Sequence, residues 1–340
     1  MAPKQGSRAF WIQEPGRGEI LRRDLPPRQG GDVLVRALYS GISRGTESLV
    51  FRGRVPRSQH EAMRAPFQEG NFPAPVKYGY SSVGEVIEAD GRAGRGLLGQ
   101  RVFCLYPHQD VYIVPASAAT RLSPRLPPGR AILAANMETA VNAVWDGGAS
   151  TGDRVVVIGA GVVGLLIAWL CRQIPGTEVI AVDRNPDRVE AAAALGIGFR
   201  DEPPGDIGAD LVFHASGSPA GLRGAIGAAG AEGSVVEVSW YGDSPVSLPL
   251  GEAFHSRRLL LRSSQVGRIP PGRSPRWNTS RRLALALSLL RDPDLDVLIS
   301  GESDFEELPA VMTQLSTAPG EALCHRIRYP AALAQEEESA

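Results

Sequence analysis

A glycine-rich turn at residues 159–164 has the residue types and the spacing that hold a phosphate group. It reads Gly-Ala-Gly-Val-Val-Gly, a GxGxxG pattern, and it follows the apolar run 155–158. In such a turn the first glycine permits a sharp bend, the second lets the backbone approach a pyrophosphate, and the third lets the next helix pack closely on the strand. The helix N-terminus then offers free N–H groups to the phosphates. The turn is therefore predicted to bind a dinucleotide through Gly159, Gly161, Val162, Val163 and Gly164.

Residues further along the chain supply the rest of this expected site. Asp183 lies 19 residues after Gly164, where a carboxylate accepts hydrogen bonds from both ribose hydroxyls and repels a 2′-phosphate. This favours NAD(H), but Arg184 follows at once and could pair with that phosphate, which leaves NADP(H) as the alternative. Ser216 follows another expected strand and is predicted to lie near the nicotinamide half.

Strands and helices alternate from about residue 129, and this alternation predicts the sheet that positions the site. The expected strands are 154–159, 178–183, 210–215, 234–239 and 259–263, and the expected helices are 131–145, 162–173, 187–195 and 220–229. Such spacing indicates an α/β fold with a doubly wound parallel sheet covered on both faces.

The segments on either side follow other patterns. Short strands are expected at 32–39, 83–89, 100–106 and 111–115, and residues 51–76 are predicted to form a long loop that borders a site. Helices are expected at 280–291 and 305–315, with a closing strand at 322–329.

Length and composition limit the classes of protein that fit. The 340 residues suit two domains, and 36 Lys and Arg against 37 Asp and Glu predict no binding of nucleic acid or of an anionic membrane surface. Cys104, Cys171 and Cys324 lie far apart, which argues against a disulfide scaffold and a cysteine-rich zinc site. The N-terminus has no apolar stretch of the kind a signal peptide needs, and the most apolar run, 155–170, is too short for a membrane span, so a soluble cytoplasmic protein is expected.

Four segments resemble motifs of the medium-chain dehydrogenase/reductase superfamily, which includes the zinc alcohol dehydrogenases and the quinone reductases. Residues 41–47, GISRGTE, are similar to its G-I-C-G-T-D turn, and residues 79–86, GYSSVGEV, to its G-H-E-x-x-G-x-V strand. Residues 99–102, GQRV, and 152–155, GDRV, are similar to its G-D-R-V turns. The turn at 43–47 is similar to those of branches without zinc, which include bacteriochlorophyllide dehydrogenase-like proteins.

This resemblance, which covers about residues 32–329, implies how the chain divides. It implies a GroES-like β-barrel domain at 1–127 that carries the substrate site, a Rossmann domain at 128–266, a segment 267–330 that returns to the first domain, and an acidic tail at 331–340. The active site would lie between the two domains. The strand 259–263 would pair with a second copy of the chain in a homodimer.

The resemblance also shows where the chain departs from the zinc members. Those members hold zinc with a cysteine of the first motif, the histidine of G-H-E and a Cys or Glu before the Rossmann strand. Here Ser43 or Arg44, Tyr80 and about Ala135 stand in those places, and none offers a thiolate or an imidazole. We therefore expect no zinc. The alternative is a rebuilt metal site drawn from His60, His108, Glu47 or Glu138.

Without a metal, a side chain must assist the oxygen on which charge develops during hydride transfer, unless the substrate delocalises that charge. Tyr80 occupies the place of the lost histidine and is a candidate acid/base, with its pKa lowered by a nearby ammonium. Strand alternation places Lys77 on the opposite face, so Lys77 assists only if the strand bends or if Lys77 reaches a phosphate or the substrate instead. The alternative is that Tyr80 merely fills the space of the metal. Thr46 matches the hydroxyl that relays protons in the family, and His108 is a candidate in a loop near the cleft, or else a surface histidine.

Together these expectations describe an NAD(P)-dependent oxidoreductase that acts on a carbonyl or alcohol of a small molecule without catalytic zinc. One alternative is a quinone or enone reductase, which needs no strong proton donor. The other is a nucleotide-binding sensor that has lost catalysis.

Overall fold

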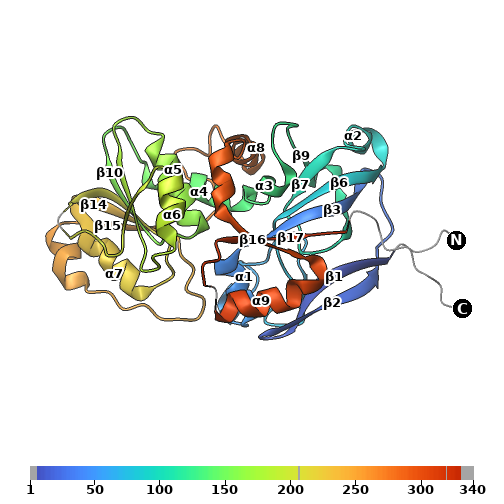
Figure 1. The fold of residues 1–340 in the computed structure, drawn as a ribbon, viewed down its shortest axis with the longest axis horizontal. Coiled ribbons are helices and arrows are strands. Elements are labelled where there is room, and N and C mark those ends of the chain that lie inside the picture. Colours follow the sequence, from blue (N-terminus) through green and yellow to red (C-terminus); the bar gives the residue numbers. More distant parts are fainter. Residues whose placement is uncertain (1–5, 206, 319, 331–340) are drawn as a thin grey trace, which may run out of the picture. The chain divides into compact units, whose positions relative to one another are not determined.

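The computed structural model describes residues 6–205, 207–318 and 320–330, so the predicted acidic tail lies outside the described residues. The chain divides into two compact units (Figure 1). Unit 1 comprises Met1–Ala134 and Ile299–Ala340, and unit 2 comprises Ala135–Leu298.

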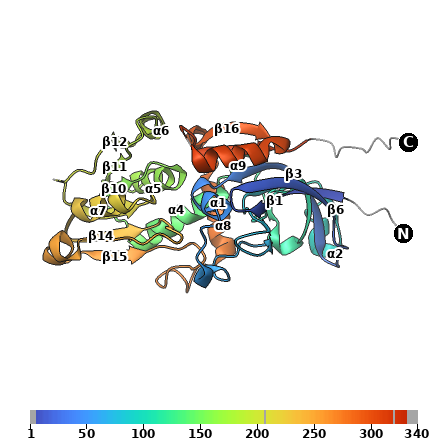
Figure 2. The same cartoon turned by 90° about the horizontal axis from the view of Figure 1, so that it is seen from below.

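Unit 2 is built on one parallel sheet of six strands, as the alternating pattern predicts. The strand order is β12-β11-β10-β13-β14-β15, and Figure 2 shows most of these strands following one another across the unit. Their bounds are β10 Arg154–Ile158, β11 Glu178–Val182, β12 Gly198–Arg200, β13 Ala209–His214, β14 Ala229–Glu237 and β15 Leu260–Ser263. The chain runs outward from β10 to β12, crosses back to β13 and runs outward again to β15. This is the doubly wound Rossmann order, and it confirms the predicted fold.

Helices connect and support these strands. They are α4 Ala134–Gly147, α5 Val162–Arg172, α6 Arg188–Ala194, α7 Pro219–Ala228 and α8 Thr279–Leu289, with shorter turns at η3 Leu250–Phe254 and η4 Pro293–Leu298. Helix α5 packs on β10 and β11, and α7 packs on β10, β13 and β14. The side chains of Val155, Val156 and Val157 are fully buried, as expected for a strand covered on both faces.

Helix α8 and η4 belong to unit 2, whereas the resemblance implied that residues 267–330 return as a whole to the first domain. A buried polar cluster explains the position of α8. Arg282 of α8 donates from Nε to Glu138 Oε1 at 3.1 Å and from one terminal nitrogen to Asn142 Oδ1 at 2.6 Å. Burial raises the pKa of Glu138, and the Arg282 charge opposes that shift. Since an unpaired buried carboxylate is costly, these bonds fix α8 against α4.

Unit 1 holds two sheets, as expected for the GroES-like domain. The larger has the order β16-β17-β3-β6-β7-β9 with β8 also paired to β3, and the smaller has the order β2-β1-β5-β4. The larger sheet contains β3 Asp32–Ile42, β6 Ser82–Ala89, β7 Arg101–Cys104, β8 Val111–Pro115, β9 Thr120–Arg121, β16 Ile299–Asp304 and β17 Cys324–Arg328. The smaller contains β1 Gly6–Glu14, β2 Arg17–Asp24, β4 Glu69–Gly70 and β5 Val76–Lys77.

The helices of unit 1 are short. They are α1 Arg44–Phe51, α2 Gly91–Arg95, α3 Pro128–Ala131 and α9 Leu308–Thr317, with 3₁₀ turns η1 Arg57–Gln59, η2 Ala116–Ala118 and η5 Phe305–Glu307. The predicted loop at 51–76 therefore carries η1 and the two-residue strand β4. The β1–β2 hairpin was not predicted, because β2 is mostly polar and does not alternate.

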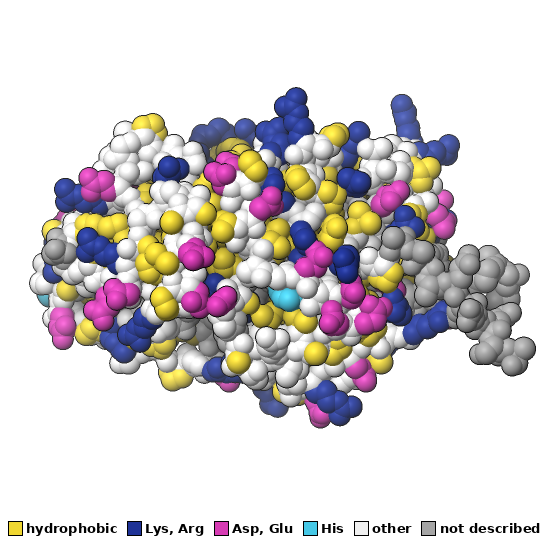
Figure 3. All heavy atoms as spheres, in the orientation of Figure 1, with side chains coloured by type: hydrophobic (Ala, Val, Ile, Leu, Met, Phe, Trp, Pro, Cys, Tyr) yellow, Lys and Arg dark blue, Asp and Glu magenta, His cyan; other side chains and the backbone are white. Residues whose placement is uncertain are grey.

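Strand β15 stands at one end of the sheet of unit 2, and its Leu260 is 48% exposed. Pairing through this strand in a homodimer stays a prediction. On the face drawn in Figure 3, acidic and basic side chains are mixed, in keeping with the balanced charge of the chain. Within the part of the chain that the structure describes, every helix is too short or too polar to cross a membrane.

Candidate functional site

The glycine-rich turn joins β10 to α5 in unit 2, where the sequence places it. Gly159 has a φ of +104°, and a Cβ there would lie 2.6 Å from the backbone nitrogen of Ser216. A Cβ on Gly164 would overlap the carbonyl oxygen of Gly159, far inside the 3.0 Å that real Cβ atoms keep. Glycine at these two positions lets the turn bend sharply and lets α5 pack directly on β10.

The middle glycine faces open space. A Cβ on Gly161 would meet nothing within 4 Å, and Gly161 is the N-cap of α5 with no side chain to accept from the first turn. The amides that follow, at Val162 and Val163, are therefore available to an anion at the positive end of the helix. The arrangement fits a pyrophosphate held by backbone N–H groups.

Asp183 lies just beyond β11, beside this turn. Its Oδ2 accepts from the N–H of Ala160 at 2.8 Å, and its Oδ1 accepts from the N–H of Asn185 at 2.9 Å. Each carboxylate oxygen keeps a second lone pair for a ribose hydroxyl. Arg184 is exposed, so its guanidinium is open to a phosphate or to water.

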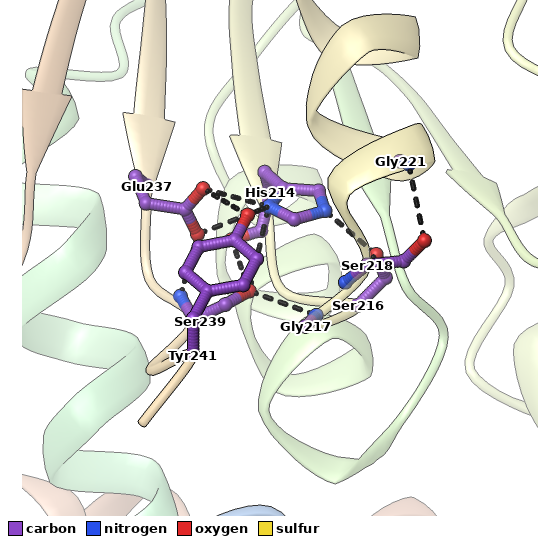
Figure 4. Close-up of polar contacts among 8 residues, drawn as sticks. All are labelled: His214, Ser216, Gly217, Ser218, Gly221, Glu237, Ser239 and Tyr241. Carbon is purple, nitrogen blue, oxygen red and sulfur yellow. Dashed lines mark hydrogen bonds and ion pairs between the residues drawn. The ribbon is translucent and has the colours of Figure 1, made fainter. Parts of the chain in front are cut away.

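Ser216 follows β13 at the carboxyl edge of the sheet, and its hydroxyl contacts the side chain of His214, the last residue of that strand. His214 Nε2 lies 2.6 Å from Ser216 Oγ, and His214 Nδ1 lies 2.9 Å from Glu237 Oε2 (Figure 4). The parallel register of β13 and β14 places His214 opposite Glu237. The role of Glu237 was missed, because this pairing depends on a register that the sequence does not display.

A second group of candidates gathers in unit 1 around Tyr80. The hydroxyls of Ser43 and Thr46 hydrogen-bond the Tyr80 phenol, and Tyr78 meets its ring edge-on with centroids 6.0 Å apart. Burial, and then the nearby charge of Glu47, raises the pKa of Tyr80 to about 12, while the two hydroxyls oppose the shift. A phenol with this pKa stays protonated at neutral pH, which suits a proton donor better than a base.

The expected lowering of the Tyr80 pKa by a nearby ammonium is wrong, because that pKa is raised and Lys77 is not among its causes. Lys77 is buried, forms an ion pair with Glu69, donates to Gln109 Oε1 at 2.6 Å and lies 5.2 Å from the centre of the Tyr106 ring. Its own pKa is lowered, chiefly by burial. Strand β5 ends at Lys77, so the chain does not continue as the regular strand on which the prediction relied.

His108 is a buried residue of unit 1, not the surface histidine of the alternative reading. Its Nε2 lies 2.8 Å from Glu47 Oε2, and its Nδ1 lies 2.7 Å from Ser40 Oγ, which is 2.9 Å from the Tyr329 hydroxyl. Glu47 Oε1 also accepts from the N–H of Ser43 at 2.7 Å. His108 thus fixes the Glu47 side chain, and Glu47 fixes the chain segment that carries Ser43 and Thr46 through its hydrogen bond to the Ser43 N–H.

Comparison with known proteins places these features in a family. A family model was sought and none matches. The 2-desacetyl-2-hydroxyethyl bacteriochlorophyllide A dehydrogenase of Rhodobacter capsulatus is 30% identical over 251 residues, which cover 68% of this chain and 72% of that protein. The chain belongs to the zinc-type alcohol dehydrogenase-like medium-chain dehydrogenase/reductase family. It is an oxidoreductase of the medium-chain type.

Solved structures of other dehydrogenases share the fold. A dehydrogenase from Sinorhizobium meliloti 1021 bound to NADP has a TM-score of 0.76 at 19% identity, with 96% of this chain and 100% of that chain covered. An alcohol dehydrogenase from Escherichia coli complexed with NADH has a TM-score of 0.74 at 18% identity, with 95% and 99% covered.

The donor set of this medium-chain protein does not fit the zinc of its family. By the family resemblance, Ser43 or Arg44 and a protonated Tyr80 stand at two of the ligand places, and none of these is a Zn²⁺ ligand of the usual kind. Across residues 6–205, 207–318 and 320–330, no three His, Cys, Asp or Glu side chains come together as a metal site. In particular, His60 contacts the Val55 carbonyl and Phe72, and Glu138 pairs with Arg282. Of the four residues named for a rebuilt metal site, all of which the structure describes, only His108 and Glu47 contact each other.

The buried and half-buried tyrosines predict a loss of stability at alkaline pH. Burial is the first cause of a raised pKa at Tyr78, Tyr80, Tyr106, Tyr112, Tyr241 and Tyr329. Unfolded tyrosines ionise near pH 10, so stability is complete below that pH and falls as the pH rises through about 12, where folded Tyr80 ionises. Urea unfolding at increasing pH, followed by tyrosinate absorbance, checks this. Bulk ionisation near pH 10 in the folded protein would contradict it.

Proposed function

We propose that this protein transfers a hydride between a nicotinamide dinucleotide and a carbonyl or alcohol of a small molecule, without catalytic zinc. The observation that carries the proposal is the turn between β10 and α5, where Gly161 opens onto free space above the helix N-terminus. Family membership supports the type of reaction. The hydroxyl groups at the former ligand places support chemistry without zinc.

The residues of unit 2 would hold the dinucleotide. The first-turn amides of α5 bind its pyrophosphate, and Asp183 accepts from its adenosine ribose hydroxyls. Ser216 stands at the carboxyl edge, where the nicotinamide half binds in Rossmann folds. When bound, the nicotinamide ring supplies or accepts the hydride.

The residues of unit 1 would manage the proton. Tyr80, which stays protonated at neutral pH, donates its proton to the substrate oxygen during reduction, and the phenolate that remains takes a proton from solvent before the next turnover. Ser43 and Thr46 hold the phenol by hydrogen bonds, so its oxygen is fixed for this transfer. His108 fixes Glu47 and acts as a positioning residue, since it is bonded to Glu47 and Ser40.

We further propose that NAD(H) is preferred over NADP(H). Asp183→Asn keeps an acceptor for Ala160 or Asn185 but removes the charge that repels a 2′-phosphate. Because a hydrogen bond to a charged group contributes about 1.5–3 kcal/mol, NADH should bind about tenfold more weakly or worse, while NADPH is affected less. Arg184→Ala is the matched control and should weaken NADPH only. Equal losses for both dinucleotides in Asp183→Asn would contradict this preference.

Turnover in the presence of a metal chelator tests the proposed reaction. The substrates are secondary alcohols and their ketones, including compounds that carry a hydroxyethyl group, since the curated relative is named for one. We expect reduced dinucleotide to be oxidised by at least one ketone at a rate that chelation leaves unchanged. Activity that disappears on chelation and returns with Zn²⁺ would contradict the proposal, and a panel that never turns over would favour the nucleotide sensor.

A further inference from the structure

Three side chains of unit 2 form a continuous hydrogen-bond chain at the carboxyl edge of the sheet (Figure 4). Ser216 Oγ lies 2.6 Å from His214 Nε2, and His214 Nδ1 lies 2.9 Å from Glu237 Oε2. A hydroxyl, an imidazole and a carboxylate in this order are the arrangement in which serine acts as a nucleophile, whatever their order in the chain.

The surrounding contacts fix which way the protons lie. Glu237 accepts from the Tyr241 hydroxyl at 2.8 Å and from the N–H of Ser239 at 2.7 Å, so it acts as a carboxylate acceptor. His214 Nδ1 must then carry the proton that it shares with Glu237. This leaves Nε2 as the acceptor for the Ser216 hydroxyl, which is the tautomer that a general base needs.

The serine is open to a reagent while its base is protected. Ser216 is exposed, whereas His214 is completely buried. Gly221 makes room for the pair, because a Cβ there would overlap Ser216 Oγ and lie 2.7 Å from His214 Nε2. The N–H of Ser218 donates to Ser216 Oγ at 3.2 Å and so orients one lone pair of the hydroxyl.

We propose that Ser216 is an activated nucleophile that takes an acyl or phosphonyl group from an ester or fluoride with a good leaving group. Ser216 Oγ forms a bond to the carbonyl carbon or phosphorus, and its proton passes to His214 Nε2. The bond to the leaving group breaks, and the alcohol leaves with that proton, or fluoride leaves while the proton goes to solvent. Water, deprotonated by the same base, then attacks the acyl-serine, which releases the acid and returns the proton to Ser216 Oγ. This reactivity does not rest on the proposed hydride transfer.

Labelling of the full chain, dialysed free of nucleotide, tests the proposal. The probe is an alkyl fluorophosphonate, and peptide mass spectrometry locates the label. We expect one label at Ser216, none there in Ser216→Ala, and a rate about a hundredfold lower in His214→Gln, which loses the base. Glu237→Gln keeps the shape of the site but removes the carboxylate that accepts from His214, so it should also slow labelling. This second variant provides the test if His214→Gln does not fold.

Ser218→Ala is the matched control, because Ser218 lies in the same loop and its hydroxyl accepts from the N–H of Gly221 rather than from His214. It should label at the wild-type rate. A folded wild-type protein that takes no label at Ser216, or labelling that is as fast in Glu237→Gln as in the wild type, would overturn the proposal.

Discussion

Replacing Gly164 by alanine is expected to abolish dinucleotide binding and to destabilise unit 2. The new Cβ would overlap the carbonyl oxygen of Gly159, so α5 must move away from β10 and carry its first-turn amides with it. Overpacking of this kind costs about 1–3 kcal/mol of the free energy of unfolding. Displacing the amides removes several charge-assisted hydrogen bonds, and affinity for NADH should fall by about a hundredfold or more. Titration with NADH and urea unfolding measure the two effects.

Two other glycines separate binding from stability. Gly161→Ala places its Cβ in open space, so the fold should lose little stability while a pyrophosphate loses its close approach. Gly227→Ala in α7 also meets nothing within 4 Å and should change neither affinity nor stability by much. If Gly164→Ala binds NADH as the wild type does, the assignment of this turn to the phosphates is incorrect.

Replacing Tyr80 by phenylalanine is expected to lower kcat for ketone reduction by about a hundredfold or more, since it removes the proton donor. The phenol pKa of about 12 means that the wild-type enzyme keeps this donor protonated throughout the neutral range. The affinity for NADH should be unchanged, because the dinucleotide is assigned to unit 2. Steady-state kinetics with a ketone that the wild type reduces provides the measurement.

Tyr78→Phe is the control for this substitution. Tyr78 is buried beside Tyr80, so the substitution removes a phenol hydroxyl from the same segment without removing the proposed proton donor. It should leave kcat within a fewfold of the wild type. Near-normal rates in Tyr80→Phe would remove Tyr80 as the acid and favour a quinone or enone substrate, which delocalises the charge itself.

Local pattern predicts the Rossmann sheet well but places residues distant in the chain less well. The apolar strand Val155–Ile158 and the glycine turn after it are local features, and the structure has them where the sequence puts them. The alternation of strands and helices over residues 154–239 is also a local pattern, and it predicts the parallel sheet for that reason. The β1–β2 hairpin was missed, because its stability comes from pairing rather than from an apolar pattern on both strands.

The candidate site shows the same contrast. Ser43 and Thr46 hydrogen-bond Tyr80, although the spacing of these residues in the sequence alone would not have grouped them. The hydrogen bond from His214 to Glu237 depends on the register of two parallel strands. Lys77 donates to Gln109, which is 32 residues away in the sequence. Such long-range pairs are set by tertiary packing, so no local pattern reports them.

Calorimetric titration of the purified, chelator-treated protein with NADH and with NADPH tests the central claim most directly. That claim is that the turn from Gly159 to Gly164 holds a nicotinamide dinucleotide on the amides of α5. The account predicts saturable binding of NADH, tighter than that of NADPH, and its loss in Gly164→Ala. A folded wild-type protein that binds neither reduced dinucleotide would contradict it.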